Sequence, residues 1–334
     1  MIALFAAFVL AMLVTVAVTP AVGKIAERCG AMAVPRDRDV HDKPTPRWGG
    51  IAIYLGVIVA VALTVSYRHY ATHGVFGWNR HIAGILIAGT FIGLLGMVDD
   101  LRDLRAIWQI AAIAGAGAIL IAFGVRIEGV SNPFVSHTIG TYHPNQWIQL
   151  SVPLSIIATL FWVLLVTKTV DAIDGLDGLA AGVCAISAAT LALMASQSRQ
   201  HDGTALALLG AAVVGACVGF LRHNYSPARI FMSTVGAQFL GLTLAALSIL
   251  GTFKIAAAIS VAVPLLVLGV PIFDYGIVLF KRFVQKAPLT VADRRHLHHR
   301  LLDRGLSKQQ AVWVIYGCTA ALCGVAIVVF NFSK

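Results

Sequence analysis

Two adjacent aspartates, Asp99 and Asp100, follow an apolar run over residues 82–98 that is long enough to cross a bilayer. Neighbouring carboxylates repel each other and are costly beside hydrocarbon, so such a pair usually binds a cation or takes part in proton transfer. A simpler alternative is that both are solvated loop residues before Arg102 and Arg105. The pair predicts cation or proton chemistry if other polar groups reach the same membrane surface.

A second set of carboxylates, Asp171, Asp174 and Asp177, recurs every third residue between two apolar runs. On a helix this spacing places neighbours on one face. Glycines follow Asp174 and Asp177 and favour a turn there. An EF-hand calcium loop is not indicated, because its spacing and terminal Glu are absent. Helix capping would explain one of these aspartates but not three beside a membrane, so the set predicts a functional site.

A proline-rich loop before residue 50 carries His41, Lys43 and Arg47. Pro44 and Pro46 force an extended backbone, which holds the basic groups in a restricted arrangement. Basic groups held in this way suit a phosphate or a nucleotide. The alternative is that these charges only set the orientation of the chain in the membrane.

The segment 292–305 places three histidines among arginines. Zinc binding is one alternative, but no nearby cysteine supports it and the surrounding arginines oppose a cation. Arginine and histidine together are better suited to a polyanion such as a diphosphate. Asp274 lies inside the preceding apolar run, where a bare carboxylate is costly, so it is expected to face the protein interior. The expected diphosphate-binding residues are His296, His298, His299 and Arg300, beside Arg294 and Arg295.

The composition requires a membrane to position these residues. The chain is 58% hydrophobic and 12% charged, with mean hydropathy +0.84, which excludes an ordinary soluble domain. Its apolar runs have helical length and lack the alternation of β-barrel strands. We predict an all-α, polytopic integral membrane helical bundle, a single transmembrane domain over residues 1–334, with ten transmembrane helices, or eleven if the long ninth run is broken. The runs span 2–22, 49–66, 82–98, 106–125, 148–167, 178–197, 203–221, 234–251, 255–280 and 311–330.

The distribution of basic residues predicts the orientation. Loops after the odd-numbered runs carry about 19 of the 25 Lys and Arg, which places these loops in the cytoplasm and both termini outside. All the polar clusters then lie on the cytoplasmic side. This bias, with contact to anionic lipid or a phosphorylated substrate, explains the net charge of +10 without nucleic-acid binding. Carboxylates at one end of their spans favour catalysis at an interface over a secondary transporter, whose acids lie near mid-membrane.

Several of these motifs, in this order, resemble those of the polyprenyl-phosphate N-acetylhexosamine-1-phosphate transferases. The resemblance runs from about residue 20 to residue 305. The His-Leu-His-His form is more similar to the GlcNAc-1-phosphate branch than to the related phospho-MurNAc-pentapeptide transferases. The motifs that carry the resemblance are Pro44–Gly50, Gly96–Asp100, Ile173–Gly182, Pro271–Asp274 and Asp293–Leu301.

The resemblance implies a bacterial inner-membrane enzyme with a cytoplasmic active site, in which a homodimer remains an open alternative. A polyprenyl phosphate would attack the sugar-linked phosphate of a UDP-N-acetylhexosamine, UMP would leave, and a cell-envelope polysaccharide would begin. Mg²⁺, or alternatively Mn²⁺, would neutralise the developing charge. Asp99 and Asp100 would serve the lipid phosphate, one as a base, and Asp174 and Asp177 would shape the metal and nucleotide site. His296, His298 and His299 would hold the diphosphate. Together with Lys43, Arg47 and Arg300 from the residue patterns above, they are the predicted substrate-binding residues.

Three positions depart from the family pattern. Lys168 and Asp171 stand where the family usually has Asn, and Thr234 replaces the aspartate of its Gly-Asp-x-Gly motif. A hydroxyl is a weaker magnesium ligand than a carboxylate. One hypothesis is that Asp171 supplies the missing carboxylate, beside Asp174, as a metal ligand. A second hypothesis concerns Lys168: its ammonium group would pair with Asp171, or its positive charge would partly replace that of the metal ion. The alternative function is a catalytically impaired relative that acts as a membrane scaffold or regulator.

Overall fold

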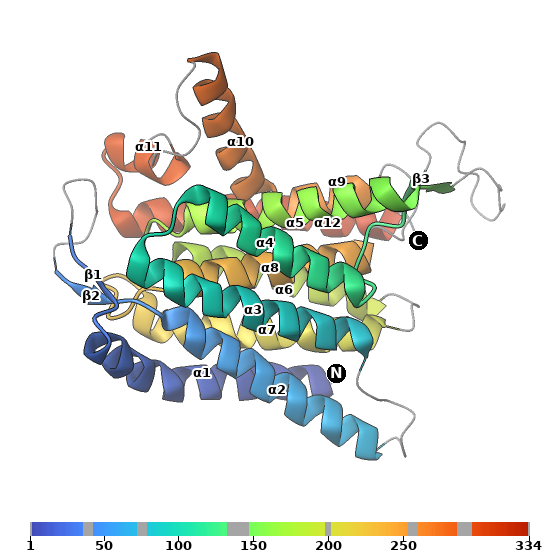
Figure 1. The fold of residues 1–334 in the computed structure, drawn as a ribbon, viewed down its shortest axis with the longest axis horizontal. Coiled ribbons are helices and arrows are strands. Elements are labelled where there is room, and N and C mark those ends of the chain that lie inside the picture. Colours follow the sequence, from blue (N-terminus) through green and yellow to red (C-terminus); the bar gives the residue numbers. More distant parts are fainter. Residues whose placement is uncertain are drawn as a thin grey trace.

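The computed structural model is an all-α helical bundle, as predicted (Figure 1). It describes residues 2–35, 43–71, 79–131, 147–197, 202–252, 259–285 and 296–332. Within these ranges, eight helices are long and apolar enough to cross a membrane. They are α1 (Ile2–Arg28), α2 (Gly49–Ala71), α3 (Arg80–Arg102), α5 (Val152–Ile173), α6 (Leu179–Gln197), α7 (Gly203–Asn224), α8 (Ser233–Thr252) and α12 (Lys308–Phe332).

Two of the ten predicted spans take a different form. The fourth, α4 (Ala106–Ala122), is apolar but has only 17 residues. The ninth is broken, as its length suggested: α9 (Ile259–Val267) ends before Leu268 and α10 (Gly269–Val284) begins after it. Pro264 and Pro271 lack backbone donors and weaken a continuous helix there. Because α10 leaves the bundle at a steep angle, the number of crossings stays a prediction (Figure 1).

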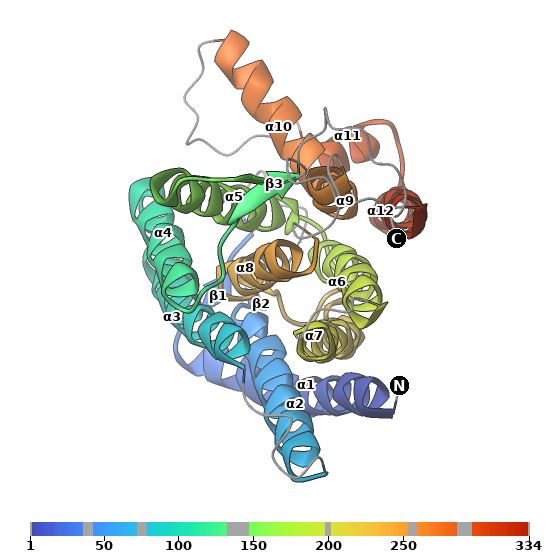
Figure 2. The same cartoon turned by 90° about the vertical axis from the view of Figure 1, so that its right-hand side faces the viewer.

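Helix α8 lies at the centre of the bundle (Figure 2). It contacts α9 as well as α2 to α7, and most of its side chains are buried. Its small residues allow close approach: a Cβ on Gly50 of α2 would overlap the backbone of Gly236 in α8. Close packing at glycine is the usual basis of helix association in membranes. Trp162 of α5 adds a hydrogen bond of 2.9 Å from its Nε1 to Ser248 Oγ.

Short polar connections cover one end of the bundle. Strands β1 (Met32–Ala33) and β2 (Thr45–Pro46) form an antiparallel pair there. The backbone N–H of Phe231, before α8, donates to the Pro46 carbonyl at 2.9 Å, and Gly49 N–H donates back to the Phe231 carbonyl at 2.9 Å. The loop before α2 and the turn into α8 therefore form one hydrogen-bonded unit.

The remaining elements lie at one end of the bundle or the other. Helix α11 (Leu297–Asp303) lies at the same end as β1 and β2, whereas both termini and the strand β3 (Gly129–Ser131) lie at the opposite end (Figure 1). Strand β4 (Trp147–Gln149) pairs antiparallel with β3. The polar clusters singled out in the sequence therefore gather at the end remote from the termini.

Candidate active site

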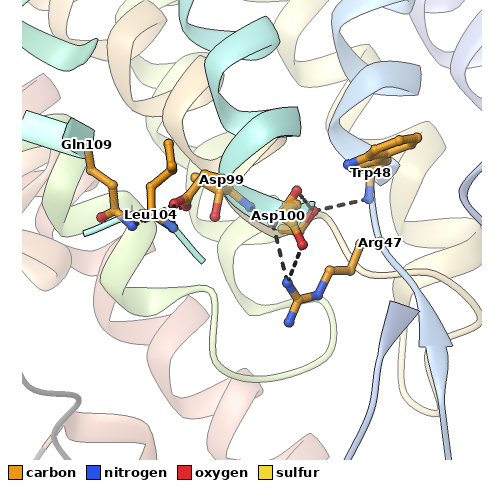
Figure 3. A network of polar contacts seen from close by, with 8 residues as sticks. Arg47, Trp48, Asp99, Asp100, Leu104 and Gln109 are labelled. Carbon is orange, nitrogen blue, oxygen red and sulfur yellow. Dashed lines mark hydrogen bonds and ion pairs between the residues drawn. The ribbon is translucent and has the colours of Figure 1, made fainter. Parts of the chain in front are cut away.

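Asp99 and Asp100 lie in the last turn of α3, and their carboxylates have different partners (Figure 3). Both oxygens of Asp99 accept hydrogen bonds from Gln109 Nε2 of α4, at 3.0 and 3.1 Å. The backbone N–H of Leu104 adds a third hydrogen bond at 3.0 Å. Asp99 is therefore held against the α3–α4 connection as a hydrogen-bond acceptor.

Asp100 instead anchors the beginning of α8. Its Oδ2 accepts a hydrogen bond of 2.7 Å from Ser233 Oγ, and its Oδ1 accepts one of 3.4 Å from Thr234 N–H. Arg47 Nη1 lies 3.9 Å from the same carboxylate and donates to the Asp100 carbonyl at 3.1 Å. Trp48 N–H donates to Ser233 Oγ at 3.1 Å. One aspartate thus joins the loop before α2 to the turn into α8.

Two residues at this junction have left-handed backbone angles. Trp48 has φ of 71° and Ser233 has φ of 56°, values that residues other than glycine rarely adopt. Both residues are tied by the same hydrogen bond. Residues in such conformations persist where the surrounding structure fixes them, and they cluster at functional sites.

Asp174 follows the last residue of α5 and brings the second carboxylate set to the first. Its pKa is raised to about 7, mainly by burial and also by the negative charges of Asp171 and Asp100, while a hydrogen bond from Ser233 N–H lowers it. The carboxylates of Asp99–Asp100 and of residues 171–177 are therefore parts of one site. Asp174 therefore takes up a proton more readily than an ordinary aspartate does.

Asp177 holds a neighbouring loop in place. Its carboxylate accepts a hydrogen bond of 3.1 Å from Ala228 N–H. The adjacent Gly178 has φ of 78°, donates to Asn224 Oδ1 at 3.0 Å and accepts from the Tyr316 hydroxyl at 2.6 Å. Asp177 therefore stabilises the loop that contains Ala228. Its catalytic role stays a prediction.

Lys168 pairs with Asp171, one of the arrangements predicted for the altered positions. Its Nζ lies 2.6 Å from Asp171 Oδ2 and 3.0 Å from Gln109 Oε1. Gln109 in turn holds Asp99. We call this chain of contacts from Asp171 to Asp99, through Lys168 and Gln109, the lysine relay. It links α5, α4 and α3.

Asp274 is buried, as expected, and positions the first histidine of α11. Its Oδ2 lies 2.9 Å from His296 Nδ1, and its Oδ1 accepts a hydrogen bond of 2.7 Å from Leu297 N–H. A carboxylate that accepts from the first N–H of a helix acts as a cap and is favoured by the helix dipole. Asp274 therefore fixes both the histidine and the helix that carries the next two.

His298 packs directly on the turn that contains Asp174. A Cβ on Gly175 would lie 2.6 Å from His298 Nε2, so only glycine allows this contact. The pKa of His298 is lowered to about 3, mainly by burial and also by the neighbouring rings of His299 and His296, while the Asp274 carboxylate raises it. The ring is therefore neutral at physiological pH and can donate one hydrogen bond and accept one.

The other predicted binding residues lie nearby or outside the described ranges. His299 is half-buried, with its ring centroid 4.3 Å from that of His298. Arg300 is half-buried on α11, and Lys43 is exposed at the start of a described range. The predicted residues His41, Arg294 and Arg295 lie outside the described residues.

Two residues of the site were not predicted from the sequence. Gln109 is the most polar side chain of the otherwise apolar run 106–125, which is a usable signal for an interior role. Ser233 offers a weaker signal, because serine is common at the first turn of a helix. Their roles depend on α4 and α8 lying beside Asp99 and Asp100.

The donor set around Asp174 fits a divalent cation in combination with substrate oxygens. Mg²⁺ is usually held by one or two carboxylates together with phosphate oxygens. Asp174 and Asp100 are oxygen donors of this kind, and the pKa of Asp174 is raised by burial and by the neighbouring carboxylates of Asp171 and Asp100. Among the described residues, no three His, Cys, Asp or Glu side chains converge as a ready-made metal centre. Lys168 competes with a metal for Asp171, whose role as a ligand stays a prediction.

Known proteins are similar in sequence to this chain over most of its length. A protein from Bacillus subtilis named "Probable undecaprenyl-phosphate N-acetylglucosaminyl 1-phosphate transferase" is 35% identical over 316 residues, 95% of this chain and 82% of that protein. A "Decaprenyl-phosphate N-acetylglucosaminephosphotransferase" from Mycobacterium leprae is 35% identical over 322 residues, 92% of this chain and 78% of its own. A "Phospho-N-acetylmuramoyl-pentapeptide-transferase" from a Mycobacterium species is 29% identical, covering 96% of this chain and 95% of that protein.

The model of the family described as glycosyl transferase family 4 matches residues 82–252. This region includes the Asp99–Asp100 pair, the lysine relay, the Asp174 turn and the beginning of α8. The resemblance found in the sequence motifs is thereby confirmed. Both the matched region and the relatives lead to one conclusion: the chain is a member of glycosyl transferase family 4.

Proposed function

We propose that this protein transfers GlcNAc-1-phosphate from UDP-GlcNAc to a polyprenyl phosphate and releases UMP. The observation that carries the proposal is the convergence of Asp100, Asp174 and His298 at one end of the membrane-spanning helices. The names of the relatives support a polyprenyl-phosphate acceptor and an N-acetylglucosamine group. The UDP donor is the part of the proposal that rests on the motif resemblance alone.

The reaction exchanges one phosphorus–oxygen bond for another. An oxygen of the acceptor phosphate bonds to the sugar-linked phosphorus while the bond to UMP breaks, and catalysis depends on positioning and charge stabilisation. Asp99 and Asp100 serve the acceptor end, where Arg47 lies 3.9 Å from Asp100. His298 is neutral and offers a hydrogen bond to a diphosphate oxygen without adding charge. A divalent cation held by Asp174 would neutralise part of the diphosphate charge.

The location of the site is also part of the proposal. The loops at this end carry most of the basic residues, which favours a cytoplasmic active site in a bacterial inner membrane. A nucleotide-sugar donor would reach the site from water, and a lipid acceptor would reach it from the bilayer. A product of this kind would start a cell-envelope polysaccharide.

The test is UMP release by the purified protein in detergent, with undecaprenyl phosphate, UDP-GlcNAc and titrated magnesium. Asp100→Asn is expected to lower kcat by about 10²- to 10⁴-fold, the range for loss of an acid–base or charge-positioning group. Glu128→Gln, at an exposed residue beside β3 at the opposite end, is the control and should match the unchanged protein. Equal rates for both variants would overturn the proposed site.

A restoration variant tests the alternative of an impaired scaffold or regulator. Thr234→Asp, Lys168→Asn and Asp171→Asn together recreate the family pattern. Turnover by the unchanged chain would support the proposed transfer. No turnover by the chain but turnover by the variant would show that the scaffold is intact and that the three substitutions removed the activity. No turnover by either would overturn the choice of substrates.

A further inference from the structure

The carboxylates of the candidate active site are not equally available to a cation. Both oxygens of Asp99 and both oxygens of Asp100 accept hydrogen bonds. Asp171 is paired with the Lys168 ammonium at 2.6 Å. Asp174 differs, because burial and then the charges of neighbouring carboxylates raise its pKa. Of these four acids, Asp174 is therefore the one that most favours an added positive charge.

The Lys168 ammonium is a positive charge held inside this group of carboxylates. It lies 2.6 Å from Asp171 Oδ2 and 3.0 Å from Gln109 Oε1, and Gln109 in turn donates to Asp99 (Figure 3). The side chains of Lys168 and Asp171 are each only 20% exposed, and salt screens charges in such a place weakly. The lysine relay thus supplies the site with a cation of its own.

This ammonium changes what the protein alone can offer to a metal ion. Asp171 lies close enough to Asp174 that its charge is the strongest of the charges acting there, so a free Asp171 would be a second carboxylate beside it. The ion pair with Lys168 occupies Asp171, and the ammonium repels a divalent cation. Thr234, whose N–H donates to Asp100, has a neutral side chain and adds no negative charge.

We propose that Lys168 is an internal cation that occupies Asp171, so that a divalent cation binds weakly to the protein alone and tightly only together with the diphosphate of the donor. The inference rests on the proposed function and adds the way in which the cation enters the site. Phosphate oxygens would supply the ligands that Lys168 withholds, and their charge would offset its repulsion. The cation and the diphosphate therefore bind as one unit.

Removal of the ammonium should create a metal site that the unchanged protein lacks. Binding of Mn²⁺ to the purified protein in detergent, without nucleotide, is measured by electron paramagnetic resonance. Lys168→Gln is expected to tighten Mn²⁺ binding at least about tenfold, because it removes a positive charge and frees Asp171. Lys24→Gln is the matched control: Lys24 is exposed in the last turns of α1, at the same end of the bundle, and its loss should change the affinity less than about twofold.

Two further variants separate this role from that of an ordinary structural ion pair. Lys168→Gln combined with Asp171→Asn should return to the weak affinity of the unchanged protein, because the freed ligand is absent. Lys168→Arg keeps the charge and should change the affinity less than about threefold. Unchanged or weaker Mn²⁺ binding by folded Lys168→Gln would overturn the proposal, as would a double variant that binds Mn²⁺ as tightly as Lys168→Gln does.

Binding of UDP tests the dependence on a diphosphate without turnover and without any variant. In calorimetric titrations of the unchanged protein, Mg²⁺ should tighten UDP binding at least about tenfold relative to EDTA, since the coupling between two ligands is reciprocal. UMP, which lacks the second phosphate, is the control and should gain less than about threefold. Equal UDP affinity with Mg²⁺ and with EDTA would overturn the proposal, also where Lys168→Gln does not fold. Tighter Mn²⁺ binding by Lys168→Gln without UDP binding by any variant would support the role of the lysine and overturn only the proposed donor.

Discussion

At the scale of single residues, the carboxylates of the site differ by their hydrogen-bond partners. Asp99 is held by a glutamine and Asp100 by a serine, and Asp171 is paired with a lysine. Asp174 has carboxylates around it and a pKa of about 7. The same type of side chain therefore supports the backbone in one place and, in the function we propose, would bind a cation in another.

Removal of the lysine in the relay should destabilise the protein. Lys168→Met leaves Asp171 without its ion pair and the Gln109 oxygen without its donor, a loss of about 1–3 kcal/mol because both charged side chains are one-fifth exposed. Asp171→Asn in the same chain should recover most of this loss. Thermal unfolding in detergent of both single variants and the double variant gives the coupling. Additive losses would contradict an energetic link between the two residues.

The buried histidine predicts a dependence of stability on pH. His298 has a pKa of about 3 in the folded protein, below its ordinary value of 6.5, so protons bind more readily to the unfolded chain. Its contribution to stability is complete above pH 6.5 and is lost as the pH falls towards 3, by up to about 1.4 kcal/mol per pH unit. Replacement of the His298 imidazole should therefore weaken the dependence of stability on pH.

The measurement is the thermal unfolding midpoint of the protein and of His298→Gln between pH 5 and pH 7. The unchanged protein should lose more stability on acidification than the variant does. Parallel curves would show that His298 is protonated with similar ease in the folded and unfolded states.

The chemistry of the site could be predicted from the sequence further than its contacts could. Asp99, Asp174 and His298 were identified because a charged or basic residue beside an apolar run costs free energy, and such a residue usually has a functional role. Gln109 and Ser233 were not identified, because their roles depend on which helices become neighbours. The pairing of Lys168 with Asp171 was accessible, since residues three apart share a helix face.

At the scale of elements, the contact between α2 and α8 should tolerate no side chain. Gly50→Ala would force these helices apart and cost about 1–3 kcal/mol through overpacking. It would also disturb the Trp48–Ser233 hydrogen bond and lower activity. Gly93→Ala in α3 meets nothing within 4 Å and should stabilise the protein by about 0.5–1 kcal/mol. The measurement is the thermal unfolding midpoint of each variant. A shift in the same direction for Gly50→Ala and Gly93→Ala would contradict this account of the packing.

Helix positions followed from hydropathy because each span must satisfy its backbone hydrogen bonds internally. The break between α9 and α10 was anticipated from the length of its run, but not the direction in which α10 leaves the bundle. That direction depends on contacts such as Asp274 with His296 of α11. The arrangement of the helices around α8 could not be predicted either, because hydropathy does not indicate which helices pack against each other.

At the scale of the whole molecule, the orientation in the membrane can be measured directly. Cys29, exposed just after α1, belongs to the end that we place in the cytoplasm. A membrane-impermeant maleimide should label it only after spheroplasts are permeabilised. Ile148→Cys, exposed in β4 at the other end and studied in a Cys29→Ser chain, should be labelled in intact spheroplasts. Labelling in the opposite pattern would invert the topology.

The hydrogen bond from Trp48 to Ser233 joins residues that are 185 positions apart. During synthesis, the loop before α2 and the Asp99–Asp100 pair are complete long before α8 leaves the ribosome. Until α8 inserts, Asp100 lacks both of its α8 hydrogen bonds, and the turn at Asp174 lacks its central support. A chain interrupted before residue 233 would hold the acidic residues of the site without their arrangement. The arrangement of the site is thus completed late in biogenesis, when α8 joins the bundle.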